Sequence, residues 1–184
     1  MAKQLKILLH ACCAPCVTVP IRRLSAESVT DVFFYNPNIS PREEYLLRER
    51  EITELGRRWE FHVQTGPYDY QNWRKWVRGH EDDPERGVRC QLCIKMRLQK
   101  TAQMAKAGGY DQFTTTLTLS PLKDAGMIHL IGQEVAELTD VEFLAADFKK
   151  HDGFKQSVEY SRLEKLYRQD FCGCQFSRRK RRIG

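Results

Sequence analysis

The sequence predicts an α/β fold: a single Rossmann-like domain over residues 1–177, with a mostly parallel sheet and helices on both faces, followed by a basic tail at 178–184. Three observations support this. A length of 184 residues suits one compact domain. Short apolar runs alternate with longer amphipathic segments, the pattern of strands that alternate with helices. With 41% apolar and 29% charged residues, the chain is neither disordered nor membrane-embedded.

Each predicted strand is a short run of apolar or β-branched residues that ends in turn-forming residues. The first run stops at two cysteines and a proline, the second at Asn-Pro-Asn, the third at Gly-Pro, and the threonine-rich fourth at Ser-Pro. The predicted strands are 5–10, 31–35, 60–64, 113–119 and 141–144.

The predicted helices place apolar side chains on one face and polar side chains on the other. The second helix is long and strongly charged, with Ser40 as its expected N-cap and Pro41 as its first residue. A pair of glycines closes the fourth helix. The predicted helices are 17–24, 41–59, 70–78, 91–106, 127–138 and 161–170.

Ligands of parallel α/β sheets bind beyond the carboxyl ends of the strands. The unusual residues of this chain collect there, because cysteines, asparagines and lysines follow the predicted strands directly. The segments at this edge are 12–16, 35–38, 64–68, 116–120 and 147–150. The sequence therefore predicts a cysteine-rich site at the carboxyl ends of the strands.

Seven cysteines occur without a secretory signal, which indicates a reducing, cytoplasmic location. Clustered thiols in that compartment bind metals or carry electrons more often than they form structural disulfides. They fall into three groups: Cys12, Cys13 and Cys16; Cys90 and Cys93; Cys172 and Cys174.

The Cys90-x-x-Cys93 pair lies at a predicted helix start, where two thiols share one face and the helix N-terminus favours the thiolate. Four thiolates from two groups can hold a tetrahedral zinc or an iron–sulfur cluster, and spacing alone does not choose between them. The adjacent Cys12 and Cys13 do not suit a zinc loop, which favours a cluster.

Two other functions remain open from the residues. Cys13-Ala-Pro-Cys16 has the form of a thioredoxin-like redox motif, which suggests a thiol–disulfide oxidoreductase. The chain could also be a non-enzymatic, zinc-stabilised RNA-binding module. Cys172 and Cys174 are separated by one glycine, so a disulfide between them would be strained and easily reduced, which suits electron transfer; they could equally be metal ligands.

The net charge of +6 is concentrated at the end of the chain, where five basic residues stand in the last seven positions. This tail suits contact with a phosphate backbone, or it is simply solvated. Trp73 and Trp76, interleaved with basic residues, suit a stacking platform for an RNA loop, although core packing explains them too. No segment suggests a membrane partner.

Six motifs in order resemble the epoxyqueuosine reductases of the QueH type, over residues 5–177. They are Leu-Leu-His-Ala-Cys-Cys-Ala-Pro-Cys at 8–16, Phe-Tyr-Asn-Pro-Asn-Ile at 34–39, Arg-Cys-x-x-Cys at 89–93, the threonine-rich run with Ser-Pro at 114–121, Asp-Phe-Lys-Lys at 147–150 and Tyr-Arg-Gln-x-Phe-Cys-Gly-Cys at 167–174.

The resemblance implies the last step of queuosine biosynthesis, in which epoxyqueuosine at the wobble position of a tRNA is reduced to queuosine. It implies a [4Fe–4S] cluster on Cys12, Cys13, Cys90 and Cys93, and a redox-active disulfide between Cys172 and Cys174. Cys16 is then a further ligand, to the cluster or to an additional mononuclear metal ion. The partners are the tRNA and an electron donor that the sequence does not identify.

Removing the epoxide oxygen takes two electrons and two protons, and a cluster with an open iron could bind that oxygen and pass electrons singly. The candidate proton donors are Tyr35, Asp147 and Lys150, with His10 less direct. The candidate substrate-binding residues are Asn36, Asn38, Lys150 and Trp73. Turn formation explains the asparagines as well, and a capping role explains Asp147.

Overall fold

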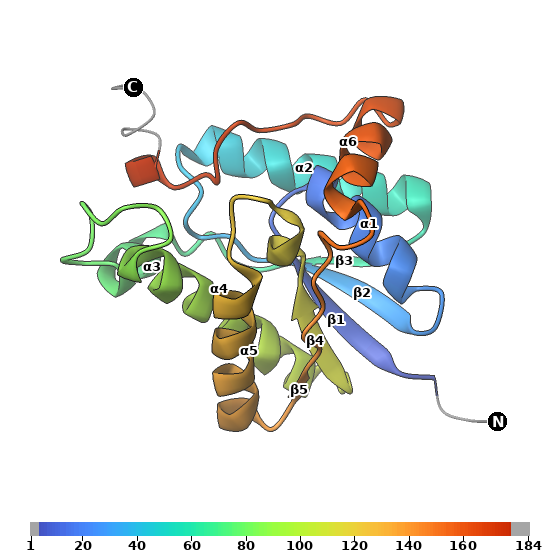
Figure 1. Ribbon diagram of the computed structural model, residues 1–184, viewed down its shortest axis with the longest axis horizontal. Coiled ribbons are helices and arrows are strands. Elements are labelled where there is room, and N and C mark those ends of the chain that lie inside the picture. The colour runs from blue at the N-terminus through green and yellow to red at the C-terminus, as the bar shows by residue number, and fades with distance from the viewer. Residues whose placement is uncertain (1–3, 178–184) are drawn as a thin grey trace.

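The protein folds around one five-stranded parallel sheet, as the computed structural model in Figure 1 shows; the structure describes residues 4–177. The strand order is β3-β2-β1-β4-β5, and every neighbouring pair is parallel. The predicted α/β fold class is therefore confirmed. The strands are β1 (Lys6–Ala11), β2 (Val29–Phe34), β3 (Val63–Thr65), β4 (Gln112–Thr115) and β5 (Glu142–Phe143).

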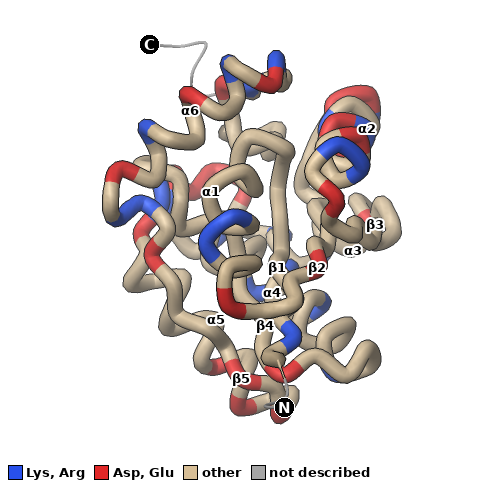
Figure 2. Tube along the Cα trace, turned by 90° about the vertical axis from the view of Figure 1, so that its right-hand side faces the viewer, with Lys and Arg blue, Asp and Glu red and all other residues tan. Residues whose placement is uncertain are grey.

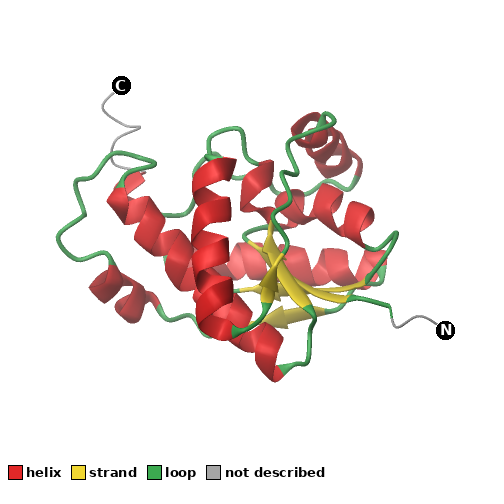
Figure 3. Ribbon diagram, turned by 60° about the horizontal axis from the view of Figure 1, so that its bottom comes forward, coloured by secondary structure: helices red, strands yellow, loops and turns green. Residues whose placement is uncertain are grey.

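Two layers of helices cover the sheet because successive strand residues point to opposite faces. Leu8 and Phe33 pack in one apolar cluster, with α3, α4 and α5, while Leu9 and Val32 pack in the other, with α1 and α2. Helix α6 packs against α1, and Figure 3 shows the helices around the sheet. The helices are α1 (Ala14–Leu24), α2 (Arg42–Trp59), α3 (Tyr70–Trp76), α4 (Val88–Ala107), α5 (Ala125–Thr139), α6 (Gly153–Leu163) and the 3₁₀ helix η1 (Thr116–Leu119).

Several predicted boundaries differ from those of the structure, and three of the differences have an identifiable cause. The strand predicted over 113–119 ends at Thr115, whose hydroxyl accepts the Leu117 N–H at 3.2 Å and turns the chain into η1. The helix predicted over 161–170 instead spans Gly153–Leu163, and the chain takes a left-handed conformation at Lys165. Ser40 does not cap α2, whose N-cap is Pro41; the Ser40 N–H instead donates to the Gly173 carbonyl at 2.9 Å.

The strand order reverses between β1 and β4: the strand that follows β1 lies on one side of this pair, and the strand that follows β4 lies on the other. Such a reversal opens a crevice at the carboxyl ends of the two strands, where ligands bind in this class of sheet. Cys12 follows β1 directly and Thr116 follows β4. The fold therefore places the first cysteine group at the mouth of this crevice. Among the described residues, no helix is long and apolar enough to cross a membrane.

Candidate functional site

A cavity of about 220 Å³ lies at the carboxyl edge of the sheet, and four cysteines from all three predicted groups line it: Cys12, Cys16, Cys90 and Cys172. They come from the β1–α1 turn, the start of α4 and the segment after α6. Five cationic side chains share this lining: Arg48, Arg86, Arg97, Lys123 and Arg168. Two acidic ones join them, Glu85 and Asp170. The cavity thus combines thiols with an excess of positive charge.

The first cysteine group is compact because the start of α1 holds it. Cys13 is the N-cap of α1, and its sulfur accepts the Cys16 N–H at 3.3 Å. The sulfur atoms of Cys12, Cys13 and Cys16 all lie within 4.8 Å of one another. Hydrogen bonds from the Cys13 and Cys16 thiols lower the pKa of Cys12, whereas burial raises the pKa of Cys13 to about 12. Cys12 therefore releases its proton more readily than its two neighbours.

A buried histidine supports the turn that carries these cysteines. The His10 ring contacts the Thr115 hydroxyl through Nδ1 at 2.9 Å and the Tyr35 carbonyl through Nε2 at 3.1 Å. Burial, with the nearby positive charge of Arg97, lowers the pKa of His10 to about 4. His10 is therefore neutral at physiological pH and joins three strand ends.

Cys90 and Cys93 stand one turn apart at the start of α4, as the sequence predicts. Cys90 lines the cavity, while Cys93 is buried, which raises its pKa. Arg97 follows on the same side of the helix; its Nε donates to the Cys93 carbonyl at 3.3 Å, and its guanidinium also lines the cavity. A buried cation therefore lies between the two cysteine-bearing segments.

The third group lies on an irregular segment that is held by its backbone. Arg48 donates to the carbonyls of Phe171 at 3.2 Å and Cys172 at 3.3 Å, and the Ser40 N–H donates to Gly173. All seven cysteines are free thiols, so the predicted disulfide between Cys172 and Cys174 is not formed in this structure. A hydrogen bond from the Cys174 thiol lowers the pKa of Cys172. Cys172 is therefore the more nucleophilic partner of the pair.

Arg48 and Arg97 are site residues that the sequence analysis missed. Figure 2 shows acidic and basic residues interleaved along α2, which suggests a solvated face, yet Arg48 is only 1% exposed. Arg48 lies one turn before Ile52 on the apolar side of α2, and this spacing is the sequence feature that indicates its burial. Arg97 stands seven residues after Cys90, hence on the face of α4 that carries both cysteines.

Several predicted substrate-binding residues are occupied by structural contacts. Asn36 is fully buried; its amide donates to the Ala11 carbonyl at 2.9 Å and accepts from Arg97 at 3.4 Å. Trp73 is also fully buried, so core packing, the alternative considered for it, describes it in this structure. Asn38 donates to the Cys172 carbonyl at 3.5 Å. These side chains build the walls of the site and offer no free surface to a base.

The predicted proton donors also lie away from the cavity lining. Tyr35 is buried in the core, stacked on Phe33, and burial raises its pKa to about 12. Asp147 accepts the Lys149 N–H at 3.2 Å and contacts the Lys149 ammonium at 3.5 Å, which is the capping role considered for it. Lys150 is exposed, and its carbonyl accepts from Arg23.

The donor set around the cavity fits an anionic metal group. The three sulfurs of the first group are close enough to share a metal or adjacent metals, and Cys90 faces the same cavity. The indole Nε1 of Trp73 is buried beside the Cys93 thiol, and its interaction with that thiol opposes the rise in the Cys93 pKa that burial causes. A sulfur-rich group would balance the charge of Arg97.

The model of the family described as epoxyqueuosine reductase QueH matches residues 7–180 of this chain. The relatives include the epoxyqueuosine reductase QueH of Histophilus somni, 39% identical over 176 residues, which cover 95% of this chain and 72% of that protein. The enzyme of the same description from Thermotoga maritima is 36% identical over 179 residues, with 96% and 92% covered.

A solved structure of similar fold is the U34-tRNA thiolase NcsA of Methanococcus maripaludis with its [4Fe–4S] cluster. The TM-score is 0.57 at 9% sequence identity, and the match covers 95% of this chain and 62% of that protein. A predicted subunit of a tRNA methyltransferase from Methanocaldococcus jannaschii gives a TM-score of 0.56 at 12% identity, with 84% and 74% covered. At this identity the likeness concerns the fold alone.

Proposed function

The chain belongs to the epoxyqueuosine reductase QueH family, and from this premise we propose that it reduces epoxyqueuosine at the wobble position of tRNA to queuosine. The reaction removes the epoxide oxygen: two carbon–oxygen bonds break, a carbon–carbon double bond forms, and two electrons and two protons convert the oxygen to water. We place this reaction in the cytoplasm, where thiols are kept reduced.

The observation that carries the proposal is that cysteines from three distant segments line one cavity at the reversal point of the sheet. Such a collection of thiols suits a site that holds a metal cluster and handles electrons, as a reductase does. The surrounding arginines suit a substrate that carries phosphates. The site therefore suits redox chemistry on a nucleic acid.

We assign a [4Fe–4S] cluster to Cys12, Cys13, Cys90 and Cys93, and Cys16 to an additional metal ion beside it. When bound, the cluster supplies single electrons and a Lewis acid. The residues of the chain prepare the site for it: the start of α1 gathers three sulfurs within 4.8 Å, and Arg97 supplies a buried positive charge. We assign Cys172 and Cys174 to relay of reducing equivalents, with Cys172 as the thiolate.

The geometry gives little support to the thioredoxin-like alternative. An attacking thiol in that chemistry is exposed and has a lowered pKa. Cys13 is only 1% exposed, its pKa is raised, and its sulfur is engaged as the N-cap of α1. The Cys13 and Cys16 pair therefore suits metal binding better than attack on an external disulfide.

The test is conversion of the modified nucleoside. The protein is reconstituted anaerobically with iron and sulfide, then incubated with tRNA that carries epoxyqueuosine and with a low-potential one-electron reductant such as reduced viologen. Nucleoside mass spectrometry should find queuosine, and a reaction without the reductant is the control. Unchanged epoxyqueuosine, from protein that retains its cluster and binds the tRNA, would reject the proposed function.

A further inference from the structure

Lys123 is a cation in the cavity that the reaction proposed above does not yet use. It lines the cavity with Cys12, Cys90 and Cys172, and it is half-buried. Within residues 4–177 its ammonium group has no hydrogen bond or ion pair. Burial raises the pKa of Cys93 and the Cys174 thiol lowers the pKa of Cys172, and the charge of Lys123 acts in the lowering direction on both, so Lys123 faces the cysteine side of the cavity.

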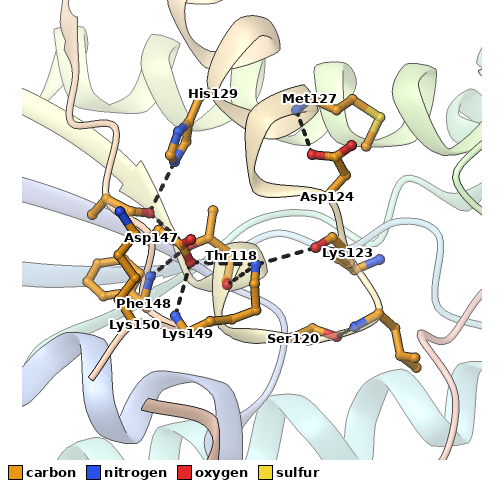
Figure 4. Close-up of polar contacts among 12 residues, drawn as sticks. Thr118, Ser120, Lys123, Asp124, Met127, His129, Asp147, Phe148, Lys149 and Lys150 are labelled. Carbon is orange, nitrogen blue, oxygen red and sulfur yellow. Dashed lines mark hydrogen bonds and ion pairs between the residues drawn. The ribbon is translucent and has the colours of Figure 1, made fainter. Parts of the chain in front are cut away.

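The turn that carries Lys123 is fixed by Lys149, which is not among the residues that line the cavity, and Figure 4 shows these contacts. The Lys149 ammonium donates to the Thr118 carbonyl at 3.0 Å and to the Lys123 carbonyl at 3.4 Å, and Asp147 lies 3.5 Å from the same ammonium. The Lys123 N–H donates back to the Ser120 carbonyl at 3.2 Å. The backbone of Lys123 is therefore held while its side chain stays available.

We propose that Lys123 is the catalytic residue that donates a proton to the epoxide oxygen, and that Lys149 and Asp147 are positioning residues for the turn that presents it. The inference rests on the proposed function. As the carbon–oxygen bonds break, two electrons arrive from the external one-electron reductant, Lys123 supplies one of the two protons, and solvent supplies the other and reprotonates the amine.

The chemistry of the other lining residues favours Lys123 for this role. Arginine does not release its proton in proteins, so the four arginines of the cavity bind anions and donate hydrogen bonds only. Glu85 and Asp170 lie on the exposed rim. Lysine is an ammonium donor that serves in general acid–base catalysis. The sequence predicts Asp147 or Lys150 as the proton donor, and the inference assigns this role instead to Lys123 on the adjacent loop.

The first readout is binding without turnover, measured on oxidised, cluster-loaded protein with no reductant. Wild-type protein should bind epoxyqueuosine tRNA more tightly than queuosine tRNA, which lacks the oxygen, by about tenfold or more, because a hydrogen bond from a charged donor is lost. Lys123→Met should abolish this preference and leave the affinity for queuosine tRNA unchanged. Lys106→Met, an exposed lysine in the last turn of α4, is the matched control.

The second readout is turnover. Lys123→Met should lose about 10²- to 10⁴-fold, the usual contribution of a general acid. Lys123→Arg should retain the binding preference but not the turnover, because arginine keeps its proton. Equal weakening of both tRNAs by Lys123→Met would make Lys123 a phosphate contact, and wild-type turnover in Lys123→Arg would exclude proton donation; either result overturns the inference. Failure of the wild-type protein to form queuosine would instead overturn the proposed function.

Discussion

The first and third cysteine groups face the same cavity but are held in different ways. Cys12, Cys13 and Cys16 stand between β1 and α1, and the helix start sets their spacing. Cys172 and Cys174 stand on an irregular segment after α6, and its backbone is held by Arg48 of α2 and by Ser40 of the loop before α2. Regular elements therefore fix the proposed metal ligands of the first group, while the proposed redox pair depends on tertiary contacts.

Replacing Arg48 should have the largest effect on the segment that carries Cys172 and Cys174. Arg48→Met removes two donors to the segment and leaves the half-buried Glu44 without its cation, which should lower the free energy of unfolding by about 3–5 kcal/mol. Urea unfolding measures the change. Arg50→Met, an exposed arginine on the same helix, is the control and should change stability by about 0.5 kcal/mol or less. Equal effects of the two variants would contradict the holding role of Arg48.

Replacing Gly173 should have the next largest effect on the stability of the irregular segment. Its φ of +102° lies in the region that favours glycine, and an added Cβ would lie 2.7 Å from Ile39 Cγ1. Gly173→Ala should cost about 2–4 kcal/mol from backbone strain and overpacking together. Gly109→Ala, at φ +67° with open space around it, isolates the strain alone and should cost about 1–2 kcal/mol. A Gly173→Ala penalty no larger than the Gly109→Ala penalty would show that the segment is not packed against Ile39.

His10 supports the turn that carries the first cysteine group, and its titration should make the stability of the protein depend on pH. Its pKa of about 4 in the folded protein lies below the ordinary 6.5, so the unfolded chain binds the proton more readily. Stability from neutral His10 is fully present above pH 6.5 and is lost as the pH falls towards 4. Between pH 7 and pH 5 the loss should be about 2 kcal/mol.

Thermal or urea unfolding of His10→Gln should show a pH dependence weaker than that of the wild type by this amount. His62→Gln, which changes an exposed histidine, should keep the wild-type dependence. An identical pH dependence in His10→Gln and wild type would mean that His10 is not held neutral by burial.

The reactivity of the thiols distinguishes the two cysteine groups in the folded protein. In metal-free, reduced protein near pH 7, iodoacetamide should label Cys172 before Cys13 and Cys93, because the Cys174 thiol lowers the Cys172 pKa while burial raises the other two. Peptide mapping by mass spectrometry gives the order. Faster labelling of Cys13 than of Cys172 would reverse the proposed division of roles.

The same contrast explains what the sequence could and could not predict. The order of strands and helices, the first cysteine group and the Cys90 and Cys93 pair follow from local patterns, so they were predictable. The burial of Arg48, the turn that presents Lys123 and the occupation of Asn36 by the Ala11 carbonyl arise from contacts between distant segments. A motif indicates which residues matter, but it does not separate a side chain that faces the cavity from one that supports its wall.

The central claim is that two cysteine regions with different roles share one site, and iron and sulfide content after anaerobic reconstitution tests it most directly. Single serine variants of Cys12, Cys13, Cys90 and Cys93 should lose the cluster and its visible absorption, whereas Cys172→Ser and Cys174→Ser should retain both. Retention of a full cluster in Cys90→Ser, or its loss in Cys172→Ser with the fold intact, would contradict the account.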